Sequence, residues 1–287
     1  MNKVKIGLAL GGGGPKGIAH IGVLKVLAKY KIPIDYVAGT SAGAIAGGFY
    51  AANLNPLEME DYLMKKGWLE TIKLILDPSL KQGLLQGKKL EDFLKKYLKN
   101  TRFQDLRIPF KAIATNLANG EKVVLDKGDL IKAIIASCSI PMIFKPVNWE
   151  GKLLVDGGIC SPVPVNTVRK MGANIVIAVN LYNHNQNNII SEKNNFITNG
   201  LQTINLMINR LSLIEIQTAD LIVNPEVDWI SLKTLISQKG KIAAIAKGEL
   251  AMETMLPELR RLIALKQKSS LTKKLLHWSK KIFNLNR

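Results

Sequence analysis

The stretch YVAGTSAGAIAG, from Tyr36 to Gly47, places one serine, Ser41, between two glycines, Gly39 and Gly43. The apolar run before the serine favours a buried strand, and the small residues after it favour a helix that packs closely on a sheet. In a G-x-S-x-G turn between a strand and a helix, the serine hydroxyl stands clear of the backbone, and the glycines remove side chains that would clash there. The stretch therefore predicts a nucleophilic serine at the edge of an α/β sheet.

The segments on either side of this turn predict a β-α-β unit followed by a further helix. Residues 4–10 and residues 34–38 are short apolar runs typical of buried strands. Between them, Ile18, Ile21 and Leu24 recur at the spacing of one helix face. Later strands are predicted at residues 110–117, 121–126, 151–158, 173–181 and 219–225, and helices at residues 129–139 and 239–265. This alternation predicts an α/β fold, with three α/β/α layers around a doubly wound, mostly parallel sheet.

Composition divides the chain into a domain with an insertion and a tail. Residues 56–100 are rich in lysine and helical in pattern, which predicts a helical insertion outside the sheet. Asparagines crowd residues 183–195, which predicts a loop. We therefore expect one catalytic domain over residues 1–265 and a basic amphipathic tail over residues 266–287.

The charge of the chain is strongly positive and unevenly placed. Lysine and arginine number 40 against 22 acidic residues, which gives a net charge of +18. The last 28 residues, from Arg260 onward, hold nine of the basic residues and no acid. Such a block indicates a polyanionic partner, either an anionic membrane surface or a nucleic acid, and a solvated lysine-rich face explains it equally well.

The absence of certain sequence motifs limits which partners and which cellular compartment we expect. No helix-turn-helix, zinc-finger or RNP-like aromatic pattern accompanies the charge, so we expect no specific nucleic-acid partner. Cys138 and Cys160 give neither a disulfide framework nor a zinc spacing, and we interpret both as small buried residues. No run approaches the roughly 20 apolar residues of a membrane span. We expect a cytoplasmic protein that can bind peripherally at the inner membrane face, and the sequence leaves its oligomeric state open.

A glycine-rich loop, Gly12-Gly13-Gly14-Pro15-Lys16-Gly17, follows the first strand. It can aim backbone N–H groups at a developing oxyanion, with Lys16 adding positive charge and the Ala42 N–H adding a donor at the start of a helix. The rival interpretation is a dinucleotide fingerprint, because these glycines also fit G-x-G-x-x-G. That fingerprint requires an acid at the end of the second strand, where Gly39-Thr40-Ser41 stands instead, so we reject it.

A serine nucleophile needs a base, and the histidines are poorly placed to supply it. After Ser41 only His184 and His277 remain, one in the asparagine-rich loop and one in the basic tail. Neither segment is expected to hold an imidazole rigidly. His20 follows the glycine loop on a predicted helix, and we interpret it as a packed helix residue. An aspartate is therefore the better candidate.

Asp156 is that candidate, in the segment LLVDGGICSPVPV, where it ends a predicted strand and precedes Gly157 and Gly158. It is expected at the same sheet edge as Ser41. A carboxylate with an ordinary pKa near 4 is a weak base, so burial beside the serine would have to raise its pKa. The alternative is a plain Asp-Gly turn without a catalytic role.

Four blocks in the order GGGPKG, GTSAG, ASCSIPMIFKPV and VDGG resemble those of the patatin-like phospholipase family, over about residues 4–182. That resemblance implies a patatin-type fold and a lipid acyl hydrolase that uses a Ser–Asp dyad and no metal or cofactor. It implies that Ser41 is the nucleophile and Asp156 the base, through an acyl-enzyme. The remaining residues that match the motifs are an oxyanion hole of Gly12, Gly13, Gly14 and Ala42, and the supporting Lys16, Gly17, Gly39, Gly43, Gly157 and Gly158.

The family resemblance leaves three matters open. Lys16 stands where many members have arginine, which preserves a point charge but not a bidentate contact. A regulatory or adaptor protein with the same fold and little turnover is the alternative function. The acyl chain, the head group and the physiological ester are not specified by the motifs.

The tail generates the first prediction. A stripe of apolar residues recurs at helical spacing among lysines, as in helices that bind the surface of an anionic bilayer. Its members are Leu271, Leu275, Trp278, Ile282 and Leu285. Truncation after Lys268 should weaken binding to anionic vesicles and leave hydrolysis of a soluble ester unchanged. Binding of the full chain should fall steeply with salt, because each lysine near such a surface contributes about 1 kcal/mol. A truncated chain that unfolds, or that binds vesicles equally well, would instead indicate a stripe packed on the domain.

Overall fold

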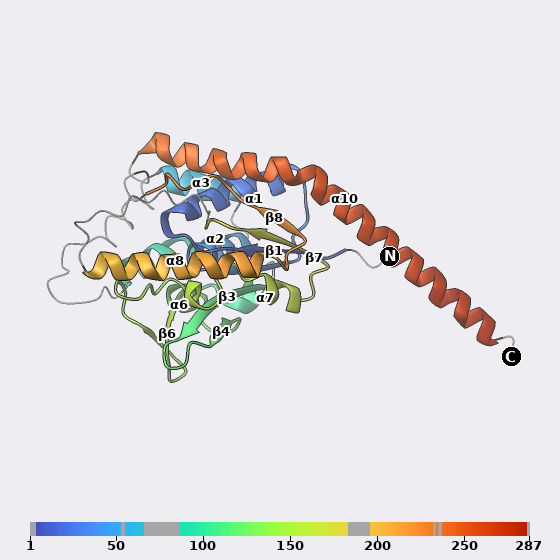
Figure 1. Cartoon of the computed structure of the whole chain (residues 1–287), viewed down its shortest axis with the longest axis horizontal. Helices are drawn as coiled ribbons and strands as arrows, with labels where there is room; N and C mark the ends of the chain where they lie inside the picture. Colours follow the sequence, from blue (N-terminus) through green and yellow to red (C-terminus); the bar gives the residue numbers. More distant parts are fainter. Residues whose placement is uncertain are drawn as a thin grey trace.

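The computed structural model describes residues 4–52, 55–65, 87–182, 196–231, 234 and 237–285. These residues form one eight-stranded sheet in the order β5-β6-β3-β2-β1-β7-β8, with β4 paired to β3 outside that path (Figure 1). The strands are β1 (Ile6–Leu10), β2 (Tyr36–Thr40), β3 (Phe110–Asn116), β4 (Lys122–Leu125), β5 (Val147–Trp149), β6 (Lys152–Asp156), β7 (Ile175–Val179) and β8 (Leu221–Val223). Strands β3, β2, β1, β7 and β8 pair in parallel, whereas β4, β5 and β6 join antiparallel. The predicted mostly parallel sheet is confirmed.

Helices cover both faces of the sheet, as the side chains of its central strand show. Leu8 and Leu10 belong to a large core shared with α1, α2, α6 and α10, whereas Ala9 faces a smaller core shared with α7 and α8. This alternation follows from the two-residue period of a strand. The helices are α1 (Ala19–Lys29), α2 (Ala42–Ala51), α3 (Pro56–Met64), α5 (Lys88–Leu98), α6 (Leu130–Ser137), α7 (Val165–Lys170), α8 (Phe196–Ile216) and α10 (Gln238–Leu285). The three-layer α/β/α architecture is therefore confirmed.

The segment expected as a helical insertion carries α3 and α5. An Asn55 capping box starts α3, since its side chain accepts a hydrogen bond from the Leu57 N–H and Glu58 reaches back to the Asn55 N–H. Residues 66–86 of the insertion lie outside the described residues, as does the asparagine-rich loop at 183–195. The sequence analysis assigned no element to β5, α7 or α8.

The long helix α10 packs along α1 through two glycines. A Cβ on Gly248 would lie 2.0 Å from the Ala19 carbonyl oxygen, and a Cβ on Gly22 would lie 2.0 Å from the Ile245 carbonyl oxygen. The helix expected at 239–265 is confirmed, and its backbone continues without a break to Leu285, beyond the rest of the molecule (Figure 1). The side chains of the predicted tail stripe lie outside the described residues, so the tail stays a prediction.

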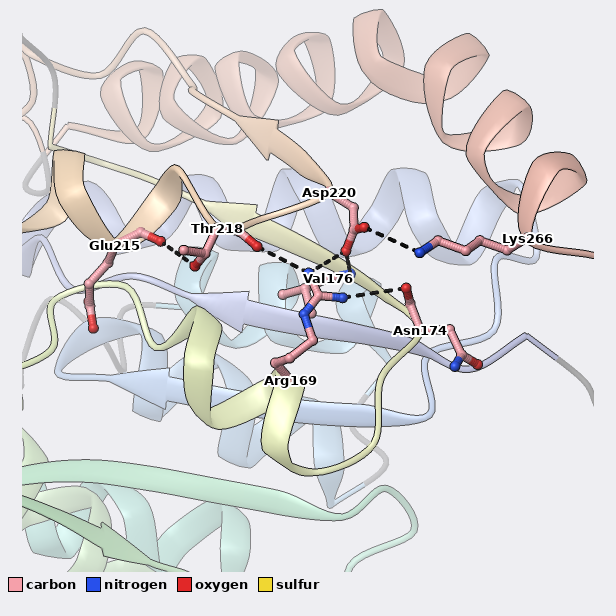
Figure 2. A network of polar contacts seen from close by, with 7 residues as sticks. All are labelled: Arg169, Asn174, Val176, Glu215, Thr218, Asp220 and Lys266. Carbon is pink, nitrogen blue, oxygen red and sulfur yellow. Dashed lines mark hydrogen bonds and ion pairs between the residues drawn. The ribbon is translucent and has the colours of Figure 1, made fainter. Parts of the chain in front are cut away.

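A polar network joins α7, β7, β8 and α10 (Figure 2). The Arg169 guanidinium donates to the Asp220 carboxylate at 2.5 Å and to the carbonyls of Asn174 and Thr218. Asp220 also accepts a hydrogen bond from the Val176 N–H at 2.8 Å. Lys266, the first residue of the expected tail, reaches the same carboxylate at 3.8 Å. The network therefore fixes the edge of the sheet and the point from which α10 extends.

No helix in the described part of the chain has both the length and the apolar character needed to cross a bilayer.

Candidate active site

Ser41 occupies a strained turn between β2 and α2. Its backbone angles are φ 53° and ψ −121°, a conformation that non-glycine residues rarely adopt. A Cβ on Gly43 would lie 2.1 Å from the Leu10 carbonyl oxygen, and one on Gly39 would lie 2.2 Å from the Gly43 carbonyl oxygen. Only glycine at both positions lets the turn close against β1. The Ser41 N–H is held by the Ser137 hydroxyl at 2.9 Å.

Asp156 reaches the same edge of the sheet from the opposite direction. Thr40 pairs with Ile113 on β3, and the next residue of β3, Ala114, pairs with Asp156 on the antiparallel strand β6. The register therefore brings the end of β6 beside the end of β2. A Cβ on Gly157 would lie 2.2 Å from the Ile113 carbonyl oxygen, so the chain can turn here only with glycine.

The Ser41 hydroxyl lies close enough to the Asp156 carboxylate to stabilise its charged form as a hydrogen-bond donor, which lowers the Asp156 pKa. Both side chains are buried, and both line one cavity of about 580 Å³. Burial raises the pKa of Asp156 from 3.8 to about 6, and the hydrogen bonds from the Ser41 hydroxyl and the Gly158 N–H oppose part of that rise. The carboxylate is thus ionised at neutral pH and more basic than an exposed aspartate.

The glycine loop borders the cavity, and its expected donors differ in availability. Gly13 and Gly14 line the cavity and have φ of 148° and 54°. The N–H groups of Gly13, Gly14 and Ala42 donate to no other group among the described residues. The Gly12 N–H, also expected as an oxyanion donor, instead donates to the Pro162 carbonyl at 3.0 Å. Of the four residues expected to form the oxyanion hole, Gly13, Gly14 and Ala42 therefore stay candidates for its N–H donors.

Gly17 and Lys16 complete the loop. A Cβ on Gly17 would lie 2.5 Å from the Ala42 Cβ, so glycine is needed for the loop to pack on the start of α2. The Lys16 ammonium pairs with the Asp228 carboxylate at 3.1 Å, and both residues line the cavity. The positive charge expected from Lys16 is present at the cavity, but an acidic neighbour partly neutralises it.

The remaining wall of the cavity is mostly apolar. Its apolar side chains come from three segments and α8: Ile140, Pro141, Ile143, Ile159, Ile230, Leu201, Ile204 and Ile208. Such a wall favours an apolar group in the bound molecule. The cavity thus combines a polar edge, which carries Ser41 and Asp156, with an apolar wall.

His20 does not line the cavity that holds Ser41 and Asp156. It is fully buried on α1, and its Nε2 donates to the Gly11 carbonyl at 2.8 Å. Burial lowers its pKa from 6.5 to about 4, so the ring is neutral and supports the glycine loop. Its interpretation as a packed helix residue is confirmed. His184 and the side chain of His277 lie outside the described residues.

The two cysteines differ from each other. Cys138 is buried, and its thiol is a hydrogen-bonding neighbour of the Ser41 hydroxyl, with a pKa that burial raises well above the usual value. Cys160, which we expected to be buried, is only partly so, and it accepts a hydrogen bond from the Thr115 hydroxyl at 3.1 Å. Within the described ranges no three His, Cys, Asp or Glu side chains gather as a metal site would require.

Three contributions to the site were missed by the sequence analysis. The Ser137 hydroxyl holds the turn, α8 forms one wall, and Tyr182 lines the cavity beside Asp156. Tyr182 follows β7, a predicted parallel strand, so its place beyond the carboxyl end of that strand was a usable signal. The sequence of α8 is apolar with scattered asparagines and carries no comparable motif.

Comparisons with known proteins identify the family of the chain. The family described as Patatin-like phospholipase matches residues 8–169, and the chain belongs to that family. An uncharacterized NTE family protein of Mycobacterium tuberculosis is 38% identical over 178 residues, which are 62% of this chain and 49% of the relative. The Lysophospholipase NTE1 of Debaryomyces hansenii is 31% identical over 186 residues, which are 63% of this chain and 12% of the relative.

A solved structure supports the fold alone. VipD from Legionella pneumophila superposes with a TM-score of 0.52 at 13% identity, covering 90% of this chain and 67% of that one. The chain spans about half the length of the mycobacterial relative and about an eighth of the yeast one. Family membership therefore supports a lipid hydrolase, and the reaction of this chain is a matter for proposal.

The raised pKa of Asp156 predicts a pH-dependent stability. A folded-state pKa above the ordinary value means that this group favours folding below pH 3.8 and loses that contribution as pH rises through about 6. Asp156→Asn, uncharged at every pH, should therefore unfold at a higher temperature than the wild type at pH 8. The gap corresponds to about 1–3 kcal/mol and should shrink as pH falls to 4. Thermal unfolding at several pH values measures it.

The matched control is Asp129→Asn at the N-terminal cap of α6. Its side chain accepts from the Lys132 N–H, and asparagine caps a helix equally well. This variant should follow the wild type at every pH. A stabilisation by Asp156→Asn that is equal at pH 4 and pH 8, or a destabilisation at pH 8, would contradict the assignment.

Proposed function

We propose that this protein is a serine esterase, a lipid acyl hydrolase of the phospholipase A or lysophospholipase type that works through a Ser41–Asp156 dyad. The observation that carries the proposal is the nearness of the Ser41 hydroxyl, in one cavity, to a buried carboxylate whose pKa is raised to about 6. A serine hydroxyl becomes an effective nucleophile when an adjacent base takes its proton.

In the first half of the reaction, Asp156 takes the Ser41 proton while the hydroxyl oxygen bonds to the ester carbonyl carbon. The carbonyl oxygen gains negative charge, and we assign its stabilisation to the N–H groups of Gly13, Gly14 and Ala42, which donate to no other group among the described residues. These donors are fixed by the backbone, so they need little reorganisation. Collapse of the intermediate returns the proton from Asp156 to the leaving alcohol and leaves an acyl-enzyme.

In the second half, a water molecule replaces the alcohol. Asp156 takes a proton from the water as its oxygen attacks the acyl carbon, and the proton then passes to the Ser41 oxygen as the ester bond breaks. The products are a fatty acid and the free enzyme. The same carboxylate thus serves both halves, which is why no histidine is required in this scheme.

The shape of the cavity supports an ester with an apolar acyl chain. Its apolar side chains come mainly from α8 and the 140–143 segment, and Ser41 and Asp156 line the same cavity. The Lys16–Asp228 pair on its wall offers a polar contact for a head group. An anionic membrane surface, approached through the basic tail, is the partner that we propose for such a substrate.

A kinetic comparison tests the proposal. Ser41→Ala and Asp156→Asn should each lower kcat/KM for a soluble nitrophenyl ester by about 10³-fold or more, and the double variant should lose no more than the worse single variant, because the two groups act as one unit. A fluorophosphonate probe should label the wild type at Ser41, as mapped by mass spectrometry. His20→Gln, whose amide can still donate to the Gly11 carbonyl, should retain activity.

Several results would overturn this assignment. They are unchanged turnover in Ser41→Ala, a probe adduct on another residue, or an active Asp156→Asn beside an inactive His184→Ala. A folded wild type that hydrolyses no ester in a panel of phospholipids, lysolipids and short esters would point to a regulatory or adaptor protein.

A further inference from the structure

Tyr182 follows the parallel strand β7 and lies at the edge of the sheet that carries Ser41 and Asp156. Strand β7 pairs with β1, so the residues after β7 lie beside the glycine loop that follows β1. The Asn180 side chain brackets the Tyr182 backbone, accepting from its N–H at 3.1 Å and donating to its carbonyl at 2.9 Å. Asn180 is itself buried and bonded to Val223 of β8. The tyrosine therefore leaves the sheet from a fixed point.

The phenol oxygen lies between the loop of the nucleophile and the loop of the base. A Cβ on Gly12 would lie 2.5 Å from the Tyr182 hydroxyl and 3.3 Å from the Ser41 Cβ. A Cβ on Gly158 would lie 3.6 Å from the same hydroxyl and 3.1 Å from the Asp156 Oδ1. Tyr182 also lines the cavity that holds Ser41 and Asp156. The Tyr182 hydroxyl therefore lies close to both Ser41 and Asp156.

The electrostatic surroundings keep this phenol protonated. Burial raises the pKa of Tyr182, and the nearby carboxylates of Asp156 and Glu215 raise it further. A neutral phenol is a hydrogen-bond donor. No hydrogen bond joins this hydroxyl to another described residue. The proton is therefore available to a bound molecule.

We propose that Tyr182 is a catalytic residue that donates a hydrogen bond to the ester carbonyl oxygen as that oxygen becomes negatively charged. The Gly12 N–H, expected as a donor, donates instead to the Pro162 carbonyl, and the Tyr182 hydroxyl lies 2.5 Å from where a Cβ on Gly12 would stand. The tyrosine thus supplies a donor at the position where the backbone does not. It keeps its proton throughout, and no bond to it forms or breaks. This inference rests on the proposed esterase function.

Tyr182→Phe in the full chain tests the inference, because it removes only the hydroxyl. With a soluble nitrophenyl ester, kcat should fall about 100- to 1000-fold, the range found when one oxyanion donor is lost. KM should change little, and the midpoint of the pH profile should stay in place. Tyr50→Phe, a partly buried tyrosine on α2, is the matched control and should keep wild-type kinetics.

Two further measurements keep the result interpretable. Thermal unfolding checks that Tyr182→Phe is folded. Should that variant be unstable, Tyr182→Gln is expected to retain more turnover than Tyr182→Leu, because an amide can donate and an alkyl group cannot.

The possible outcomes separate the inference from the function on which it rests. Wild-type kcat in Tyr182→Phe, with Ser41→Ala inactive, overturns the role of Tyr182 and leaves the esterase proposal standing. A shifted pH midpoint with an unchanged plateau also overturns it, because that result assigns the hydroxyl to Asp156. Full turnover in Ser41→Ala would overturn the esterase proposal itself.

Discussion

The contact between the Ser41 hydroxyl and the buried Asp156 carboxylate is the interaction on which the proposed chemistry depends. Burying a carboxylate costs free energy unless polar groups compensate it. Here the Gly158 N–H at 2.7 Å and the serine hydroxyl compensate part of that cost, and the remainder appears as a pKa raised to about 6. Burial thus makes the Asp156 carboxylate a stronger base beside the Ser41 hydroxyl that it is proposed to activate.

That contact in turn depends on the close approach of the backbone at the sheet edge. Gly39, Gly43 and Gly157 each stand where a Cβ would meet a carbonyl oxygen at 2.1 or 2.2 Å. Glu215 anchors α8 over the cavity, accepting from the Ser161 hydroxyl at 2.5 Å and from the Val163 N–H at 2.8 Å. The loop after Asp156 therefore links the base, the glycine loop and the apolar wall.

The sequence was sufficient for features that are set by local pattern. The turn at Ser41, the glycine loop and the strands β1 and β2 all follow from glycine spacing and short apolar runs. The Ser41–Asp156 pair was also expected at one edge, although its route through the antiparallel strand β6 depends on a register that no local pattern specifies.

The features that the sequence did not reveal depend on partners far away in the chain. The Gly12 N–H is taken by Pro162, which lies 150 residues away, so its loss as a donor was not visible in the motif. Helix α8 contributes Leu201, Ile204 and Ile208 to the cavity, but its sequence carries no motif that marks it as part of a site. Cys138 looked like an ordinary buried residue, since its nearness to Ser41 arises only when α6 packs beside α2.

The pH dependence of kcat/KM for a soluble ester tests the central claim most directly, because it reports the ionisation of the free enzyme. If Asp156 is the base, kcat/KM should rise about tenfold per pH unit at low pH, bend near pH 6 and stay level above it. A flat profile from pH 4.5 to 8 would contradict the account. So would a midpoint near the ordinary aspartate value of 4, since burial would then not have prepared the carboxylate for its role.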